Sequence, residues 1–296
     1  MFRRCQRQYF FAELAAWHNA REPQRREAYV LKQLKTLELW RGLVVHEILQ
    51  KAVVPCWQAR TPVDWDSKVT EAIALARRQF EFSRSRRYRD PTISKTKANG
   101  AYCALLPHER GLDIPEAELA RVLDQIAAAL RQLSQMTGLL ERIDRAKRTW
   151  SELHVTTEYA GARIQGQIDL LLAERSGNLA IIDWKVYGGL SAGQGDSQTA
   201  LYAWLLTRSP MWRVDNPESI ELLEVSLLDA TVVSHRFSAE HFVDLENRVF
   251  RSIEEQRALV GDGSYDPSAL GDFAYASNPN SCRFCNFRSL CALGVA

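Results

Sequence analysis

The chain has 296 residues, of which 46% are hydrophobic and 25% are charged, and its formal net charge is +2 with a pI of about 8.2. These values are ordinary for a folded globular protein of one large domain, or of a core with an added helical region. They exclude a globally basic nucleic-acid-binding protein, so any contact with nucleic acid must come from local clusters of basic residues. No apolar run reaches the length of about 18 residues that a membrane-spanning helix needs. The basic, amphipathic first residues lack the apolar segment of a signal peptide, and we expect a cytoplasmic protein without membrane contact.

The first half of the sequence is predicted to be mostly helical, with a charged break at Pro23–Glu27, a possible interruption at Gly42 and a less regular segment at Thr92–Asp113. Apolar residues recur with the spacing of a buried helical face in four segments: Phe2–Ala20, Ala28–Arg60, Trp65–Arg89 and Pro115–Lys147.

A single histidine, His46, lies within the helical stretch RGLVVHEILQ. Taken alone, a histidine on a helix is more often a capped or solvent-facing residue than a metal ligand. Imidazole can nevertheless complete the coordination of a divalent metal beside carboxylates. The interpretation of His46 therefore depends on whether carboxylates lie near it.

A short basic cluster follows the third helical segment, in SRSRRYRDP. It can be a solvated helix end, or it can be a phosphate-binding patch in which an aromatic ring stacks on a base. Both interpretations are open for its members, Arg84, Arg86, Arg87, Tyr88 and Arg89.

The stretch from Ile164 to Val186 is predicted to form a β-hairpin. Two apolar, β-branched runs, Ile164–Ala173 and Leu179–Val186, are separated by Ser176-Gly177-Asn178, which is typical of a tight turn. Runs that are this continuously apolar indicate a sheet covered on both faces. Neighbouring strands and a closing helix are expected at Glu152–Tyr159, Ile220–Leu228, Thr231–Phe237 and Ala239–Val260.

Three charged residues interrupt the apolar hairpin. Asp183 and Lys185 are two residues apart and so share a face of the strand, and Asp169 can lie beside Asp183 on the neighbouring strand. Buried charges are costly unless they are paired or bind a metal, and Mg²⁺ is typically held by one or two carboxylates. The pattern D-x-K is short, so a solvated Asp–Lys pair on a surface hairpin stays an alternative at this point.

The segment after the hairpin adds a third motif. A flexible loop over Gly193–Ser197 precedes a helix that begins near Asp196 and places Gln198 and Tyr202 on one face. In this order, G-x-I-D, I-I-D-x-K and Q-x-x-x-Y resemble the nuclease core of the PD-(D/E)XK superfamily in its RecB-like branch. The resemblance implies an α/β, restriction-endonuclease-like fold with a central mixed sheet, flanking helices and a helical insertion.

The resemblance also implies roles for individual residues. The sequence R-G-x-x-x-H-E resembles the helix motif that supplies a histidine to the metal in this branch. Lys185 would position the attacking water, and Gln198 and Tyr202 would orient Lys185 and the DNA. Glu152 lies where an acidic residue often precedes G-x-I-D, and it would bind the metal or one of its ligands. Mg²⁺ or Mn²⁺ would be held by His46, Asp169, Asp183 and the backbone carbonyl of Trp184.

Three of the six cysteines lie close together near the carboxyl end, in the pattern C-x2-C-x5-C. Such spacing suits zinc, a redox pair or an iron–sulfur cluster. With one early cysteine the pattern resembles the iron–sulfur staple of RecB-like nucleases, including the AddB type and the CRISPR-associated exonucleases. The resemblance implies a 4Fe–4S cluster, with zinc as the alternative, held by Cys5, Cys282, Cys285 and Cys291. Cys56 and Cys103 are expected to be ordinary buried thiols.

These features predict three regions: a mostly helical region at 1–149, the nuclease core at 150–260 and the cluster-binding segment at 261–296. We expect a metal-dependent DNA nuclease, an exonuclease on single strands or duplex ends, in DNA repair, CRISPR adaptation or phage defence. The alternative is a nucleic-acid-binding subunit whose nuclease site is silent or depends on a partner, such as a helicase or a defence complex. No G-x-x-x-x-G-K-[ST] motif is present, so the chain does not encode a helicase motor itself.

Overall fold

The computed structural model describes residues 1–187, 197–212, 214–261, 263–283 and 285–291. The chain divides into two compact units, each assembled from separate segments of sequence. The first unit consists of Met1–Leu37, Arg78–Ile114 and Ser252–Ala296, and the second consists of Glu38–Arg77 and Pro115–Arg251. Among the described residues, no helix is long and apolar enough to cross a membrane.

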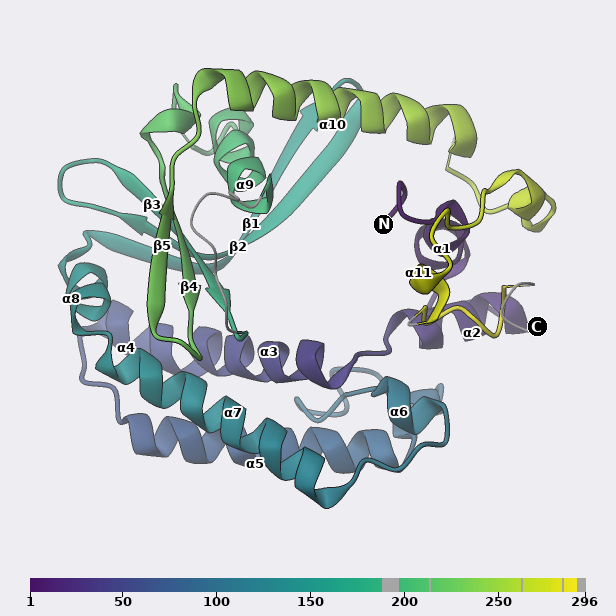
Figure 1. The fold of residues 1–296 in the computed structure, drawn as a ribbon, viewed down its shortest axis with the longest axis horizontal. Coiled ribbons are helices and arrows are strands. Elements are labelled where there is room, and N and C mark those ends of the chain that lie inside the picture. Colours follow the sequence, from purple (N-terminus) through teal and green to yellow (C-terminus); the bar gives the residue numbers. More distant parts are fainter. Residues whose placement is uncertain (188–196, 213, 262, 284, 292–296) are drawn as a thin grey trace. The chain divides into compact units, whose positions relative to one another are not determined.

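The second unit is built on a five-stranded sheet whose spatial order, β1-β2-β3-β4-β5, is the order of the sequence (Figure 1). The pairs β1/β2, β2/β3 and β4/β5 are antiparallel, whereas β3 and β4 are parallel. The mixed sheet predicted from the sequence is therefore present. Its strands are β1 (Arg148–Tyr159), β2 (Ala162–Ala173), β3 (Leu179–Lys185), β4 (Glu221–Ser226) and β5 (Thr231–His235).

The predicted hairpin is the centre of this sheet. Consecutive residues of β2 (Leu170–Leu172) and of β3 (Ala180–Ile182) are all fully buried, so both faces of the hairpin are covered, as the apolar runs predicted. The connection between the strands includes Gly177 at φ +93°, a conformation that glycine adopts without steric cost.

Helix α9 (Ser197–Arg208) covers one face of the sheet and contacts β1 to β4 (Figure 1). The close approach depends on Gly166 in β2. A Cβ atom at this position would lie 2.7 Å from Leu205 Cδ1 and 3.2 Å from the ring of Tyr202. The glycine of the G-x-I-D motif thus lets α9 bring Tyr202 down onto the sheet, beside the strand that carries Asp169.

The helices of the second unit differ in detail from the predicted segments. The segment Ala28–Arg60 is not one helix, because α3 (Leu37–Ile48) begins after a break at 33–36 and passes into a π-helical turn (Leu49–Val53) and α4 (Val54–Ala59). Gly42 does not interrupt α3. The predicted helix Pro115–Lys147 is two helices, α7 (Glu116–Gln135) and α8 (Thr137–Arg145), which meet at Met136. Helices α5 (Trp65–Arg84) and α10 (Ala239–Val260) each contribute residues to both units.

The first unit contains short helices from both ends of the sequence. The predicted break at Pro23–Glu27 is wrong, because proline fits the first turn of a helix and α2 begins there. The predicted helix Trp65–Arg89 ends at Arg84 and is followed by a separate 3-10 turn. The remaining elements are α1 (Gln6–Tyr9), a π-helix (Phe10–Ala15), α2 (Pro23–Lys32), 3-10 turns at Arg87–Arg89 and Pro267–Asp272, α6 (Leu106–Glu109) and α11 (Asn280–Arg283).

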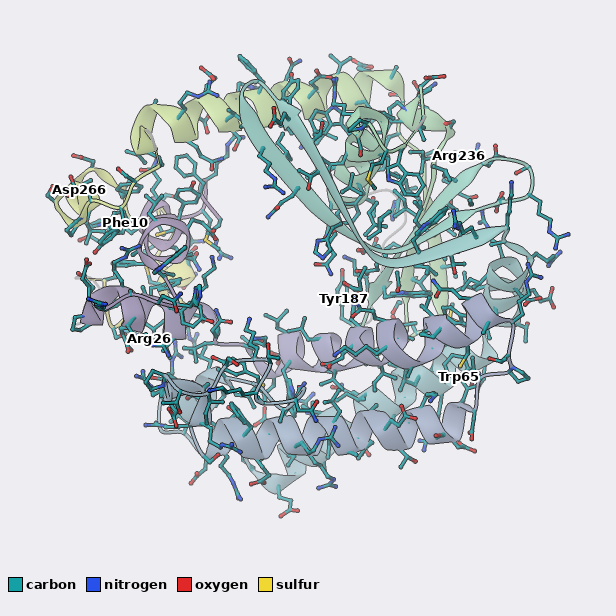
Figure 2. All side chains as sticks on the ribbon, turned by 180° about the vertical axis from the view of Figure 1, so that it is seen from behind. Phe10, Arg26, Trp65, Tyr187, Arg236 and Asp266 are labelled. Carbon is teal, nitrogen blue, oxygen red and sulfur yellow. The ribbon has the colours of Figure 1, made fainter. Side chains whose placement is uncertain are left out.

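The core of the first unit joins its amino-terminal and carboxyl-terminal segments. Phe10, labelled in Figure 2, packs edge-on against Phe273 with ring centroids 4.9 Å apart. Phe11 stacks on Phe287 at 5.8 Å, and Arg7 donates through Nε to the carbonyl of Phe273 at 3.0 Å. These contacts hold the two segments side by side although more than 260 residues separate them along the chain.

Candidate metal centre

The charged residues of the hairpin lie together at the carboxyl end of β3. Lys185 Nζ lies 2.5 Å from Asp183 Oδ2, in agreement with their expected position on one face of the strand. Leu170 pairs with Ile182 in the antiparallel register of β2 and β3. Continuing that register places Asp169 opposite Asp183, so the two carboxylates face the same side of the sheet.

The backbone pairing of β2 with β3 ends at Ile182. Beyond it, two side chains contact the backbone of β3 at Trp184. The Trp184 N–H donates to Asp169 Oδ2 at 2.8 Å. The Trp184 carbonyl lies 3.1 Å from His46 Nε2. Asp169 from β2 and His46 from α3 are therefore fixed against the backbone of the strand that carries Asp183 and Lys185.

A group of three potential metal ligands forms beside this strand end. His46, Glu152 and Asp169 each offer a ligand atom, and these atoms all lie within 4.8 Å of one another. His46 Nδ1 lies 3.4 Å from Asp169 Oδ1 and 3.7 Å from Glu152 Oε1. Two carboxylates and one imidazole are suitable donors for Mg²⁺ or Mn²⁺, so the residues present fit the metal that the sequence predicted.

Glu152 lies opposite Asp169 in the β1/β2 register and has an unusual backbone conformation. Its φ of +48° lies in the left-handed region, although it is in the middle of β1 and is not glycine. Its neighbours Ser151 and Leu153 remain paired with β2. The Glu152 carboxylate also accepts a hydrogen bond from Gln167 Nε2. Left-handed backbone in a residue with a side chain is strained and is typical of functional sites.

In the metal-free protein, His46 itself carries a positive charge beside the two carboxylates. Burial alone would lower the pKa of His46, but hydrogen bonds with the Asp169 and Glu152 carboxylates outweigh burial and raise the pKa to about 10. At neutral pH the imidazolium carries a proton on both nitrogens and neutralises part of the carboxylate charge. A metal that binds through His46 must displace one of these protons.

Asp183 lies in a strongly buried environment. Burial and the nearby Asp169 raise its pKa to about 6, against the opposing effect of Lys185. Glu224, its partner in the parallel β3/β4 ladder, adds further negative charge on the same face and pairs with His235 at 3.0 Å. An additional cation near Asp183 would therefore stabilise its charged carboxylate.

Lys185 is held by the predicted helix residues. Its Nζ donates to Gln198 Oε1 at 3.5 Å, and Gln198 Nε2 donates to the Tyr202 hydroxyl oxygen at 2.5 Å. Burial raises the pKa of Tyr202, so its hydroxyl stays protonated at neutral pH. The chain Lys185–Gln198–Tyr202 links the ammonium group to α9.

The structure thus brings the predicted catalytic and metal-binding residues together, with two differences in arrangement. Glu152, expected to bind the metal or one of its ligands, is a member of the ligand group, whereas Asp183 pairs with Lys185. The carbonyl of Trp184, expected to bind the metal, contacts His46 instead. Sequence reasoning also missed Glu224, whose only signal was its position in the predicted strand Ile220–Leu228, which the structure pairs parallel to β3.

The predicted cluster cysteines, in the first unit, line one small apolar cavity. Arg7, Phe11, Tyr275 and Phe287 form part of the same wall. Burial raises the pKa of the Cys285 thiol, and the other three sulfurs raise it further. The cavity therefore gathers Cys5, Cys282, Cys285 and Cys291. Of the two remaining cysteines, Cys103 is buried, as expected, whereas Cys56 is only partly buried.

The predicted basic patch is largely used in structural contacts within the first unit. Tyr88 is 1% exposed and its hydroxyl donates to Glu109 at 2.8 Å, so its ring is not available for stacking on a base. Arg89 pairs with Glu27 and Glu109, and Arg86 donates to the carbonyls of His108 and Glu109. Arg84 and Arg87 are exposed, although Arg84 pairs with Glu81.

Comparison with known proteins gives one match over nearly the whole chain. The model of the PD-(D/E)XK nuclease superfamily matches residues 1–292. No curated protein sequence matches. Among solved structures, the crystal structure of SSO0001 matches with 14% sequence identity and a TM-score of 0.31, covering 61% of this chain and 77% of that chain.

Proposed function

The chain belongs to the PD-(D/E)XK nuclease superfamily, and from that premise we propose that it is a metal-dependent deoxyribonuclease, an exonuclease on single strands or duplex ends. One observation carries the proposal: a group of hard metal ligands and a lysine–carboxylate pair lie at the end of one strand, within one unit. This arrangement suits hydrolysis of a phosphodiester bond.

His46, Glu152 and Asp169 would hold Mg²⁺ or Mn²⁺, and Asp183 and the carbonyl of Trp184 are further candidates. The bound ion would lower the pKa of a water molecule and neutralise charge on the phosphate. His46 Nε2 and the Trp184 carbonyl, 3.1 Å apart, would keep the imidazole in one orientation. The β1/β2 register places Glu152 opposite Asp169, within the same group.

Lys185 would act directly on the reacting groups. Its ammonium group would donate hydrogen bonds to the attacking water and to the phosphate oxygen on which negative charge develops. Gln198 and Tyr202 restrict the Lys185 side chain by the two hydrogen bonds described above. Asp183, 2.5 Å from Lys185, would keep the ammonium close to the metal ligands.

The four cysteines would hold a 4Fe–4S cluster, with zinc as the alternative. Four thiolates suit either group. The group would covalently join Cys5 to the segment Cys282–Cys291, next to the aromatic contacts that already hold these segments together. We propose a structural role, because closing so long a loop removes entropy from the unfolded chain.

DNA would reach the site with the help of exposed basic residues, and Arg84 and Arg87 remain candidates. A role in DNA repair, CRISPR adaptation or phage defence, together with a helicase or a defence complex, is part of the same proposal.

The proposal is tested by incubating the purified protein with end-labelled single-stranded DNA, the matching duplex and the matching RNA, with Mg²⁺, Mn²⁺ or EDTA. We expect shortened DNA only with a metal. Lys185→Ala should abolish cleavage, whereas Lys51→Ala, which removes an exposed lysine in the same unit, should not. Binding of DNA without cleavage under all conditions would instead support a silent or partner-dependent subunit.

The cluster is tested on protein purified without oxygen. Visible absorption with iron and sulfide would support 4Fe–4S, and colourless protein with zinc would support the alternative. Cys282→Ser should lower the thermal stability of the protein and release the metal. Cys56→Ser, outside the cavity, is the matched control.

A further inference from the structure

The end of β3 is held by three side chains, and the proposed function uses only two of them. The β2/β3 pairing stops at Ile182. Beyond it, Asp169 accepts from the Trp184 N–H and His46 contacts the Trp184 carbonyl. The third contact is to the next carbonyl on the same edge: Arg41 donates through one terminal nitrogen to the Val186 carbonyl at 2.5 Å.

Arg41 is buried, being 7% exposed. Its other terminal nitrogen donates to Gln125 Oε1 on α7 at 2.5 Å. Within the described part of the chain, Arg41 forms no ion pair at contact distance, and its Nε has no hydrogen-bond partner. Burial lowers the pKa of this guanidinium, although the Glu38 carboxylate acts to raise it, and the group stays charged at neutral pH.

A buried charge whose hydrogen bonds go only to neutral oxygens is a poor way to stabilise a fold. Well-packed apolar residues in such positions are often as stabilising or more so, and the desolvation of an ion is costly. The arginine at position 41 is therefore better explained by what it holds in place, and it holds the residue that directly follows Lys185.

We propose that Arg41 is a positioning residue for Lys185. The backbone after Lys185 is fixed on its other side by β4, since the Leu227 N–H donates to the Lys185 carbonyl at 2.8 Å and Ser226 Oγ donates to the Tyr187 carbonyl at 2.6 Å. Arg41 fixes the edge that β2 leaves open. Tyr187, labelled in Figure 2, lies two residues beyond the end of β3.

The geometry of α3 explains why an arginine is needed. Arg41 and His46 are five residues apart, so they point in directions that differ by about 140° around the helix. Only a long side chain can reach the strand from the Arg41 position. Its planar group also makes two directed hydrogen bonds at once, to Val186 and to Gln125, which a lysine cannot reproduce. Together Arg41 and His46 contact two carbonyls on the same edge, that of Trp184 near the end of β3 and that of Val186 just beyond it.

This inference rests on the proposed function, because a nuclease reaction is needed to see its catalytic effect. Cleavage is therefore measured over a range of DNA and Mn²⁺ concentrations up to saturation for wild type, Arg41→Met, Arg41→Lys and Arg121→Met. Arg121 is the matched control, since it is an exposed arginine that also contacts Gln125, at 3.3 Å. Rates are expressed per folded molecule.

We expect Arg41→Met to lower kcat about 10- to 100-fold, the range that small misplacements of catalytic groups produce. KM for DNA and the Mn²⁺ concentration for half-maximal activity should stay within about twofold of wild type. Arg41→Lys should be intermediate and Arg121→Met unchanged. A wild-type kcat in Arg41→Met, or a loss explained by the unfolded fraction alone, would overturn the proposal.

Hydrogen exchange of the metal-free protein supplies a readout that does not need cleavage. The backbone amides at 184–187 should exchange about tenfold faster in Arg41→Met than in Arg121→Met. If wild type cleaves no nucleic acid but this difference is present, the proposed function fails and the positioning of the strand stands. Equal exchange in the two variants would overturn the inference whether or not the protein cleaves DNA.

Discussion

Replacing Asp183 with asparagine is expected to stabilise the metal-free protein at neutral pH while abolishing cleavage. Asp183 is 2% exposed, and burial together with Asp169 raises its pKa from 3.8 to about 6. A carboxyl group whose native pKa lies above its unfolded pKa destabilises the fold as the pH rises through that window. Below pH 3.8 both states are protonated and the effect vanishes, whereas above pH 6 it is complete. The shift corresponds to about 3 kcal/mol.

The assay is denaturant unfolding in EDTA, followed by tryptophan fluorescence. Seven of the eight tryptophans, all except Trp17, lie in the second unit, so the signal reports mainly on the unit that contains Asp183. At pH 8 we expect Asp183→Asn to be more stable than wild type by up to about 3 kcal/mol, less whatever the ion pair with Lys185 contributes. The advantage should shrink as the pH falls from 6 toward 4. Saturating Mg²⁺ should stabilise wild type more than the variant.

Asp124→Asn, at an exposed position on α7, should show neither effect. The reasoning is refuted if Asp183→Asn is no more stable than wild type at pH 8, or if its advantage is the same at pH 5 and pH 8. Either result would mean that the Asp183 carboxylate is not held in a destabilising environment.

Further predictions concern the metal ligands and the contact beneath α9. Because His46 is protonated in the metal-free protein with a pKa of about 10, Mn²⁺ binding at pH 7 should release about one proton, and the affinity for Mn²⁺ should rise with pH. Calorimetry in buffers of different ionisation enthalpy measures the number of protons released, and Mn²⁺ binding without proton release would contradict the prediction. Glu152→Asn should keep or raise the melting temperature, since asparagine tolerates positive φ, yet weaken Mn²⁺ binding; a clear loss of stability would argue against strain at Glu152. Gly166→Ala should destabilise the protein by about 1–3 kcal/mol through overpacking against Leu205 and Tyr202, and Gly138→Ala, with open space around it, is its control in thermal unfolding.

The parts of the fold that could be predicted from the sequence are those set by local pattern. The β2–β3 hairpin follows from two apolar runs and a glycine turn, and the pairing of Asp183 with Lys185 follows from the two-residue period of a strand. Gln198 and Tyr202 share a helix face for the same kind of reason. Such features need no knowledge of distant contacts.

Features that depend on tertiary contacts could not be predicted in this way. The positive φ of Glu152 has no signal in the alternating pattern of β1. Arg41 is the arginine of the R-G-x-x-x-H-E motif, but the motif assigned a role only to His46, because the partner of Arg41, the Val186 carbonyl, lies 145 residues away. The π-helical turn that follows α3 likewise interrupts a pattern that seemed continuous. In contrast, the position of Cys5 in the same cavity as Cys282, Cys285 and Cys291 was implied by a family resemblance, not by local pattern.

The central claim, that the strand end carrying Asp183 and Lys185 is a metal-dependent nuclease site, is tested most directly by comparing wild type with Lys185→Met in two measurements on the same samples. Mn²⁺ binding is followed by calorimetry, and cleavage of end-labelled DNA is followed in the presence of Mn²⁺. We predict that both proteins bind Mn²⁺ with similar affinity and that only wild type shortens the DNA. Cleavage by Lys185→Met at the wild-type rate, or cleavage by wild type in EDTA, would contradict the account.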